Sequence, residues 1–289
     1  MAETSFYVAP LDGVTCLQVA GRFRRRRMPI AATPPGDVGP ADCFLCHPEN
    51  DRYYQGDWPA EDSSLALLGN AHPYGWESLL IAPKGTEFHE AGLAELSDLD
   101  LRRMLDPLSC AEMAADPTDR LRSCFMNMGA PAGQSRRHPH SQVVSLSAGP
   151  LSRSAQQEVA EDLEAAADED RSLDIDAYCR LVLPRKPTMT FEAWVPRPAT
   201  AYPPSQWAAS IRRVLAAVEQ ISGNYNWVSL QQPNLFRIIP RGISERAGLE
   251  FAFPGRVDSV VACSLDEARD HWRQAVAGKK PAGDAGKLT

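Results

Sequence analysis

The feature that most constrains the fold of this chain is a pattern that occurs twice. The segment "GWESLLIAPKG", residues 75–85, contains an aromatic residue, a glutamate, a strand-like apolar stretch, a proline and a basic residue, and "TFEAWVPRP", residues 190–198, contains the same features in the same order. A helical pattern follows each copy, from Leu93 to about Ala115 and over residues 205–222, where apolar residues recur at helical spacing. The repeat predicts a pseudo-symmetric pair of α+β units, and the alternative is a coincidence of two ordinary α+β patterns.

Further elements complete the two copies. We expect strands at 64–69, 121–129 and 138–146 in the first copy and at 224–230 and 235–240 in the second. Helices are expected at 152–171 and 264–278, and Pro107 should break or kink the first helix because proline lacks the backbone N–H. The expected domains are an N-terminal unit, 1–150, and a degenerate C-terminal unit, 151–289, that ends in a disordered tail.

The composition is that of an ordinary globular protein. The chain has 289 residues, 44% of them hydrophobic and 23% charged, with a formal net charge of −7 that disfavours nucleic-acid binding. No apolar run approaches the ~20 residues that span a bilayer, and the start "MAETSFYVAP" lacks the basic and apolar pattern of a signal peptide. We therefore expect a cytoplasmic protein without a membrane partner.

The cysteines give the first chemical signal. There are seven, an odd number spread along the chain, which argues against a disulfide framework. Only Cys43 and Cys46 are closely spaced, and a Cys-x-x-Cys turn can hold a metal, act as a redox dithiol or be two core residues. A metal site would need further ligands, for which the histidine candidates are His47, His72, His89, His138, His140 and His271.

A second signal is the segment "HPHSQ", residues 138–142. In an extended strand the side chains of His138, His140 and Gln142 would share one face. A neutral imidazole is a nucleophile that can attack phosphorus and form a covalent intermediate, and a glutamine amide can hydrogen-bond a phosphate oxygen as charge develops there. The alternative without functional meaning is a surface strand that contains two histidines by chance. Pro139 disfavours this alternative, because strands seldom contain internal prolines.

The loop before this segment suits an anion. Gly129 and Gly133 let backbone amides approach a phosphate closely, and Ser135, Arg136 and Arg137 add a hydroxyl and two positive charges.

At this point the residues resemble a known family. The segment "NMGAPAGQSRRHPHSQ" is similar to the active-site segment N-x-G…G-x-S-x-x-H-P-H-x-Q of galactose-1-phosphate uridylyltransferases, which belong to the histidine-triad superfamily with related nucleotide phosphorylases. The resemblance, which extends over about residues 22–275, implies two histidine-triad-like α+β units built on antiparallel sheets and flanked by helices. It also implies a ping-pong reaction through a nucleotidyl-histidine. The implied residues are the nucleophile His140, its partner Gln142, and the phosphate contacts Asn127, Gly133 and Ser135.

The resemblance also implies a zinc site. Its ligands would be Cys43, Cys46, His138 and His89, the last from "HEAGLAELS". A closed four-ligand site of this kind holds the fold and does not activate water. Asp62 stands where family members bind the ribose or base, although a turn is an equal alternative. The arginines of "RFRRRR", residues 22–27, resemble the family's basic approach to the cysteine pair.

Two departures from the family pattern affect the expected substrate. Phe236 and Ile238 replace a histidine pair in the second copy, so no second metal site is expected. Arg136 and Arg137 replace small or polar residues and add positive charge beside the phosphates, which places galactose 1-phosphate in question as acceptor.

These features predict an enzyme that transfers a nucleoside monophosphate from a nucleotide-sugar or dinucleotide donor to a phosphorylated acceptor, through His140 and with Zn²⁺ as cofactor. Two alternatives remain: a histidine-triad nucleotide hydrolase, and a non-catalytic, zinc-stabilised nucleotide-binding protein. A homodimer is expected from the resemblance alone.

Overall fold

The structure is a computed structural model. It describes residues 4–8, 15–19, 38–59, 64–73, 77–110, 113, 121–146, 153–185, 191–197, 203–230, 234–241 and 265–279. Its strands are β1 (Thr4–Val8), β2 (Thr15–Val19), β3 (Tyr54–Asp57), β4 (Leu65–Gly69), β5 (Glu77–Pro83), β6 (Leu121–Met128), β7 (Ser141–Leu146), β8 (Ser172–Asp174), β9 (Arg180–Val182), β10 (Ala193–Pro196), β11 (Tyr225–Leu230) and β12 (Leu235–Pro240). The described α-helices are α1 (Asp98–Leu105), α3 (Arg153–Ala165), α4 (Pro204–Ile221) and α6 (Leu265–Val276).

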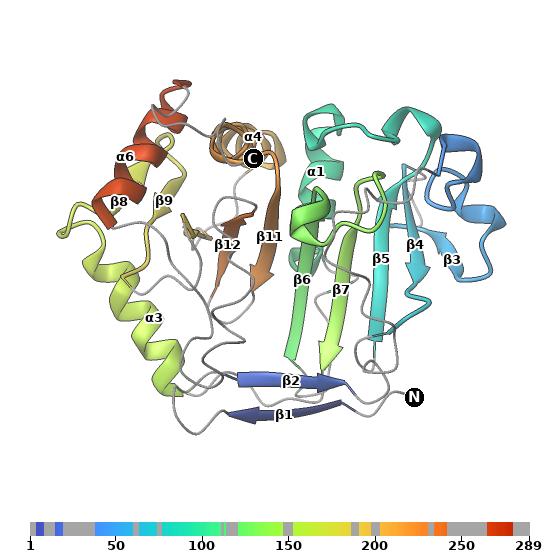
Figure 1. The fold of residues 1–289 in the computed structure, drawn as a ribbon, viewed down its shortest axis with the longest axis horizontal. Helices are drawn as coiled ribbons and strands as arrows, with labels where there is room; N and C mark the ends of the chain where they lie inside the picture. The colour runs from blue at the N-terminus through green and yellow to red at the C-terminus, as the bar shows by residue number, and fades with distance from the viewer. Residues whose placement is uncertain are drawn as a thin grey trace.

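One antiparallel sheet organises the molecule. Ten strands lie in the order β3-β4-β5-β7-β6-β11-β12-β10-β9-β8, while β1 and β2 pair in a separate hairpin (Figure 1). Counted inward from its edges, the large sheet has the order 3-4-5-7-6 in one half and 8-9-10-12-11 in the other. The fifth strand of one half, β6, therefore pairs with its counterpart β11 in the other.

This identical order confirms the predicted pair of pseudo-symmetric α+β units with antiparallel strands. The two units do not form separate sheets, because β6 and β11 hydrogen-bond along their length, with Asn127 opposite Asn226. The domain boundary predicted at residue 150 falls between 146 and 153, outside the described residues, and stays a prediction.

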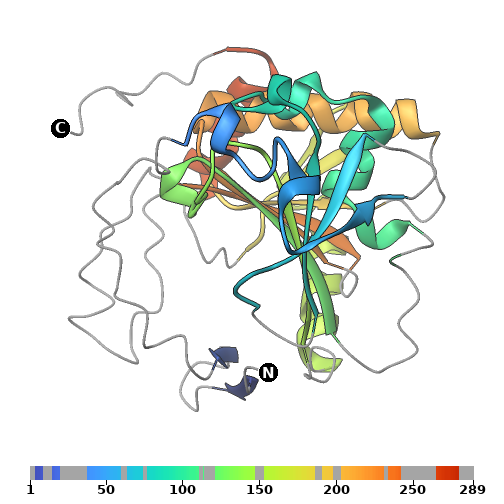
Figure 2. The same cartoon turned by 90° about the vertical axis from the view of Figure 1, so that its right-hand side faces the viewer.

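Three helices cover one face of the sheet. Figure 2 shows α1, α4 and α6 gathered on the same side, and α4 packs against both of the others. The apolar stripe of α4 is buried at Trp207, Ile211, Val214, Leu215 and Val218, as its sequence spacing predicts. Pro204 stands in the first turn of α4, where the missing N–H has no helical partner to lose.

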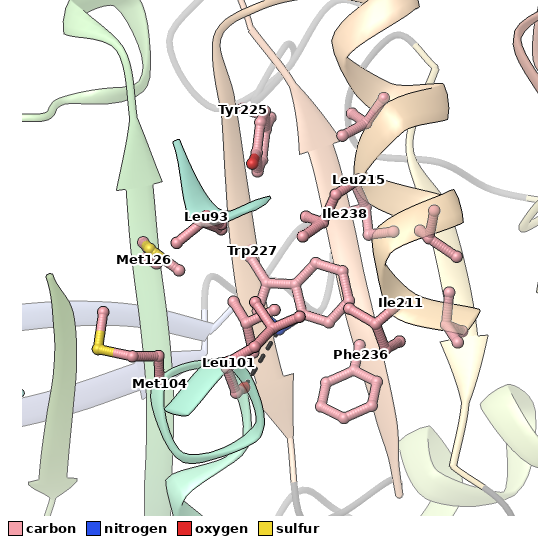
Figure 3. Close-up of a cluster of buried hydrophobic side chains, with 14 of the residues drawn as sticks. Leu93, Leu101, Met104, Met126, Ile211, Leu215, Tyr225, Trp227, Phe236 and Ile238 are labelled. Atoms are coloured by element: carbon pink, nitrogen blue, oxygen red, sulfur yellow. Dashed lines mark hydrogen bonds between the residues drawn. The ribbon is translucent and has the colours of Figure 1, made fainter. Parts of the chain in front are cut away.

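The main apolar core spans both halves of the sheet. Figure 3 shows Trp227 of β11 between Leu101 of α1, Ile211 of α4 and Phe236 of β12, and its indole Nε1 donates to the carbonyl of Leu105 at 3.2 Å. Along β11 the buried residues alternate with half-buried ones. This core is therefore on the helix side. On the opposite face of the first half, Leu68 of β4 and Leu80 of β5 pack with the Cys43–Cys46 turn in a second, smaller buried cluster.

The first helix is shorter than the sequence indicated. Residues Leu93–Glu95 form a 3-10 turn, and α1 begins after Ser97, whose side chain caps the helix by accepting from the amide of Asp100 at 3.1 Å. A second 3-10 turn, Pro107–Ser109, follows the end of α1 at Leu105. The predicted break at Pro107 is confirmed, whereas the prediction of one helix from Leu93 to about Ala115 was wrong.

Within the part of the chain that is described, no helix is both long and apolar enough to span a membrane.

Candidate functional site

Four side chains from three separate segments meet at one point. Cys43 and Cys46 lie on a turn before β3, His89 follows the 3-10 turn Thr86–Phe88 after β5, and His138 precedes β7. The thiol sulfur of Cys46 lies 3.4 Å from Nδ1 of His89 and 3.4 Å from Nδ1 of His138. All four ligand atoms lie within 4.8 Å of one another. The described residues contain no other such cluster, so the proposed ligand set is brought together as a unit.

The geometry and chemistry of this cluster fit a tetrahedral metal. Around Zn²⁺ with ordinary bond lengths, a sulfur and a nitrogen ligand would lie ~3.6 Å apart, close to the separations observed. His138 donates from Nε2 to the carbonyl oxygen of Pro83 at 2.7 Å, which leaves the lone pair on Nδ1 facing the thiols.

The protonation states of the cluster depend on burial. Burial lowers the pKa of His138 to about 4, so the ring is neutral at physiological pH. Burial, followed by the neighbouring Cys43, raises the pKa of Cys46 to about 12. A bound metal would have to displace the thiol proton, and its affinity would rise with pH.

His140 lies beside the cluster but does not belong to it. Only 6% of its surface is exposed, and its Nδ1 donates to the carbonyl oxygen of His138 at 2.9 Å. The lone pair is consequently on Nε2. Burial lowers the pKa of His140, and the positive charge of Arg136 acts in the same direction. The side chain is a neutral imidazole, the form needed by a nucleophile.

The predicted strand over residues 138–146 was wrong at its start. The strand β7 begins at Ser141, and its pairing with β6 starts at that residue. Pro139 has no N–H to donate to a ladder, and His138 is turned towards the cysteine pair. Of the three residues predicted to share one face of a strand, only Gln142 lies in β7, and His138 and His140 precede it.

Gln142 is held by a residue that sequence reasoning missed. It lies on β7 opposite Leu80 of β5, and its Oε1 accepts from Nδ2 of Asn70 at 3.5 Å. Asn70 directly follows β4, and its Oδ1 accepts from the amide of His72 at 2.9 Å, an Asx turn. The available signal in the sequence was an asparagine, Asn70, at the end of an apolar strand. In this segment only His72 was named as a candidate, for a metal ligand.

The loop before His138 depends on its two glycines. Gly129 and Gly133 flank the 3-10 turn Ala130–Ala132 with φ values of 82° and 87°, which side chains rarely tolerate. A Cβ atom on Gly129 would lie 1.9 Å from Oδ1 of Asn224, so this position also lacks space. Gly133 and Ser135 are exposed, and Asn127 is half-buried at the end of β6.

The two arginines of the loop have different surroundings. Arg137 donates to a carboxylate oxygen of Glu90 at 2.6 Å, so its charge is partnered. The guanidinium of Arg136 lies 5.6 Å from the centre of the Phe44 ring, in the turn of the cysteine pair. No ion pair joins Arg136 to a described carboxylate. Asp62 and residues 22–27, also predicted to contact substrate, lie outside the described residues.

The corresponding part of the second unit has no metal ligands among its described residues. Phe236 and Ile238 are buried in the core. Between them on β12, Arg237 donates from Nε and Nη2 to the buried carboxylate of Glu192, the residue before β10, at 2.5 and 2.8 Å. Trp194 donates to the same carboxylate at 2.9 Å. This closed set of hydrogen bonds satisfies Glu192.

Comparison with known proteins gives structural matches only. No family model matches the chain, and no curated protein matches its sequence. A GalT-like protein from Arabidopsis thaliana has a TM-score of 0.60 at 17% identity, over 80% of this chain and 91% of that protein. An Arabidopsis thaliana ADP-glucose phosphorylase with bound ADP-glucose has a TM-score of 0.62 at 14% identity, over 95% and 98%. Yeast Ap4A phosphorylase in complex with Ap4A has a TM-score of 0.53 at 15% identity, over 83% and 73%.

These similarities confirm the predicted fold. The similar structures include a uridylyltransferase, an ADP-glucose phosphorylase and an Ap4A phosphorylase, and the chain has their α+β fold.

The lowered pKa values of the two histidines predict a pH dependence. Below about pH 6.5 the unfolded chain binds protons at these positions that the folded chain does not bind. The histidine contribution to the stability of the metal-free protein should therefore be complete above pH 7 and decrease towards pH 4, the lowered pKa of His138, by roughly 1 kcal/mol per pH unit for that residue. The lowered pKa of His140 acts in the same direction.

Urea unfolding midpoints in the presence of a chelator measure this effect. His138→Gln and His140→Gln should each flatten the dependence, and His72→Gln, which changes an exposed histidine, should leave it as it is. A dependence unaltered in both of the first two variants would contradict the prediction.

Proposed function

We propose that this chain is a nucleotidyl-transferring enzyme in which His140 is transiently nucleotidylated. The observation that supports the proposal best is the state of His140: a neutral imidazole whose Nδ1 is occupied by the carbonyl of His138 and whose Nε2 has the lone pair. It lies two residues from a four-residue metal-type cluster, in the fold of nucleotidyltransferases and phosphorylases.

The proposed reaction has two balanced displacements. Nε2 of His140 attacks the α-phosphorus of the donor, a P–N bond forms, and the bond from phosphorus to the bridging oxygen of the leaving phosphate breaks. Nδ1 keeps its proton on the carbonyl of His138, so the intermediate is a nucleotidyl-imidazolium. An oxygen of the acceptor phosphate then attacks the same phosphorus, and the P–N bond breaks to return neutral His140. Splitting one displacement into two is the advantage of covalent catalysis.

The other proposed residues bind or orient the phosphates. The amide of Gln142 would donate to a non-bridging oxygen, since Asn70 already holds its carbonyl side. Asn127, Gly133 and Ser135 would contact the nucleotide phosphates, and Asp62 the ribose or base. Nucleotide substrates with a phosphate–phosphate link are supported by the ADP-glucose and Ap4A bound in the two structural neighbours. We also propose that the protein forms a homodimer and is located in the cytoplasm.

Cys43, Cys46, His89 and His138 would hold Zn²⁺. Bound there by four protein ligands, the ion would cross-link the segments that precede β3, follow β5 and precede β7. The fixed backbone of His138 then presents its carbonyl to His140.

The covalent intermediate is the direct test. Wild-type protein incubated with α-³²P-labelled UDP-, ADP- and GDP-sugars and dinucleoside polyphosphates should form an acid-labile adduct with at least one donor. His140→Ala should abolish the adduct, whereas His72→Ala should retain it. An adduct at wild-type level in His140→Ala would refute the assignment. Product analysis with and without added phosphate or sugar phosphate then separates transfer from hydrolysis.

Removal of a ligand tests the zinc site. The purified wild-type protein should contain about one zinc per chain by atomic emission, and Cys46→Ser should lower this content severalfold. Loss of the cross-link should also lower the melting temperature by roughly 5–10 °C, which for a chain of this size corresponds to about 2–3 kcal/mol. Cys110→Ser, outside the cluster, should keep the metal. Full zinc content in Cys46→Ser would exclude this ligand set.

The two loop arginines form a matched pair for a test of substrate contact. Arg136→Ala should slow adduct formation about tenfold, the loss expected when a charged hydrogen bond to phosphate is removed. Arg137→Ala removes the same charge from the next residue, but Arg137 is paired with Glu90, so the rate should change less than threefold. Equal effects of the two substitutions would contradict a special role for Arg136.

A further inference from the structure

One asparagine of the second unit reaches into the proposed phosphate site of the first. Asn226, on β11, lies opposite Asn127 of β6 across the centre of the sheet. Its Nδ2 donates to the carbonyl oxygen of Ala132 at 2.8 Å and to Oδ1 of Asn127 at 2.8 Å. Both N–H groups of the Asn226 amide are therefore used, one on the phosphate-site loop and one on the side chain of Asn127.

The direction of these hydrogen bonds follows from the backbone. A carbonyl oxygen can only accept, so Ala132 requires the nitrogen of the Asn226 amide to face it. The same nitrogen faces Asn127, which must then present its oxygen to Asn226. The amide nitrogen of Asn127 is consequently turned towards the loop, where it has one long contact with the carbonyl oxygen of Gly133, at 3.4 Å. Its second N–H has no hydrogen-bond partner among the described residues.

This orientation matters because the two ends of an amide have nearly the same shape and opposite polarity. With its nitrogen towards the loop, Asn127 offers a donor to an anionic phosphate oxygen. With the amide reversed, it would offer a carbonyl oxygen, which repels the same ligand.

We propose that Asn226 is a positioning residue that locks the amide of Asn127 with its nitrogen towards the loop, so that the N–H not bonded to Gly133 can donate to a substrate phosphate. The inference rests on the proposed function and adds that the second unit, which has no metal ligands of its own among its described residues, helps to set the polarity of the first unit's site.

The test is a double-mutant cycle with an isosteric change. Asn226→Asp keeps the size of the side chain but offers only acceptors, so Asn127 should reverse to donate to it. The affinity of the protein for ADP and for inorganic pyrophosphate, measured by calorimetry, should fall about tenfold or more. This is the loss expected when a hydrogen bond to a charged group is replaced by a repulsive contact. Adduct formation with the best donor should slow by a similar factor. Asn226→Ala, which leaves Asn127 free to adopt either orientation, should have a smaller effect.

Two comparisons separate a reversed Asn127 amide from a general loss of structure. In an Asn127→Ala background, Asn226→Asp should change affinity less than threefold, because no amide remains to be reversed. Asn224→Asp adds the same charge two residues earlier, near Gly129, and should leave affinity close to that of wild type. Melting temperatures of all variants report any loss of fold.

The outcomes distinguish the inference from the function on which it rests. If wild-type protein forms the adduct and Asn226→Asp binds pyrophosphate as tightly as wild type, the inference is overturned and the proposed function stands. If Asn226→Asp weakens binding equally with and without Asn127, its effect is structural and the inference is again overturned. If no donor labels wild-type protein, the proposed function fails in that first measurement, and the affinity cycle with pyrophosphate still decides the role of Asn226.

Discussion

The rest of the structure depends on the antiparallel pairing of β6 with β11. This pairing joins two five-stranded halves into one sheet, so that a single apolar core can form under both. Trp227, fully buried on β11, contributes to that core from the helix side. Its neighbour Asn226 points to the other face, because side chains alternate along a strand. One pairing therefore supplies both the stability of the core and the contact with Asn127.

Two backbone carbonyls determine the chemistry of the two neighbouring histidines. The carbonyl of Pro83 accepts from Nε2 of His138, which leaves Nδ1 for the thiol cluster. The carbonyl of His138 accepts from Nδ1 of His140, which leaves Nε2 as the free nitrogen. The two rings are thus held in opposite tautomers, one suited to a metal and one to phosphorus. Burial keeps both neutral, since a charged imidazole would lose its hydration.

The accuracy of the sequence-based prediction varied with the range of the interactions involved. The helix α4 was predicted within one residue at each end because its apolar stripe is long and regular. The short strands β3, β8 and β9 and the β1–β2 hairpin were not predicted, since segments of three to five residues contain too little periodicity. The start of β7 was misplaced because His138 turns towards Cys46, a residue 92 positions away.

The sequence by itself determined the two-copy α+β pattern, the close spacing of Cys43 and Cys46 and the likeness to a histidine-triad family, because spacing and motifs can be read along one chain. That the two remaining metal-type residues are His89 and His138 was only implied by the family resemblance. Only the tertiary structure decided that the two halves share one sheet and that Arg137 is paired while Arg136 has no described carboxylate partner. It likewise decided that Asn70 donates to Gln142 and Asn226 to Asn127. Each of these depends on contacts between segments distant in sequence, 72 residues apart for Asn70 and Gln142 and 99 for Asn127 and Asn226. Such contacts exist only once the strands have paired, because hydrogen-bond partners are selected by distance and direction in space.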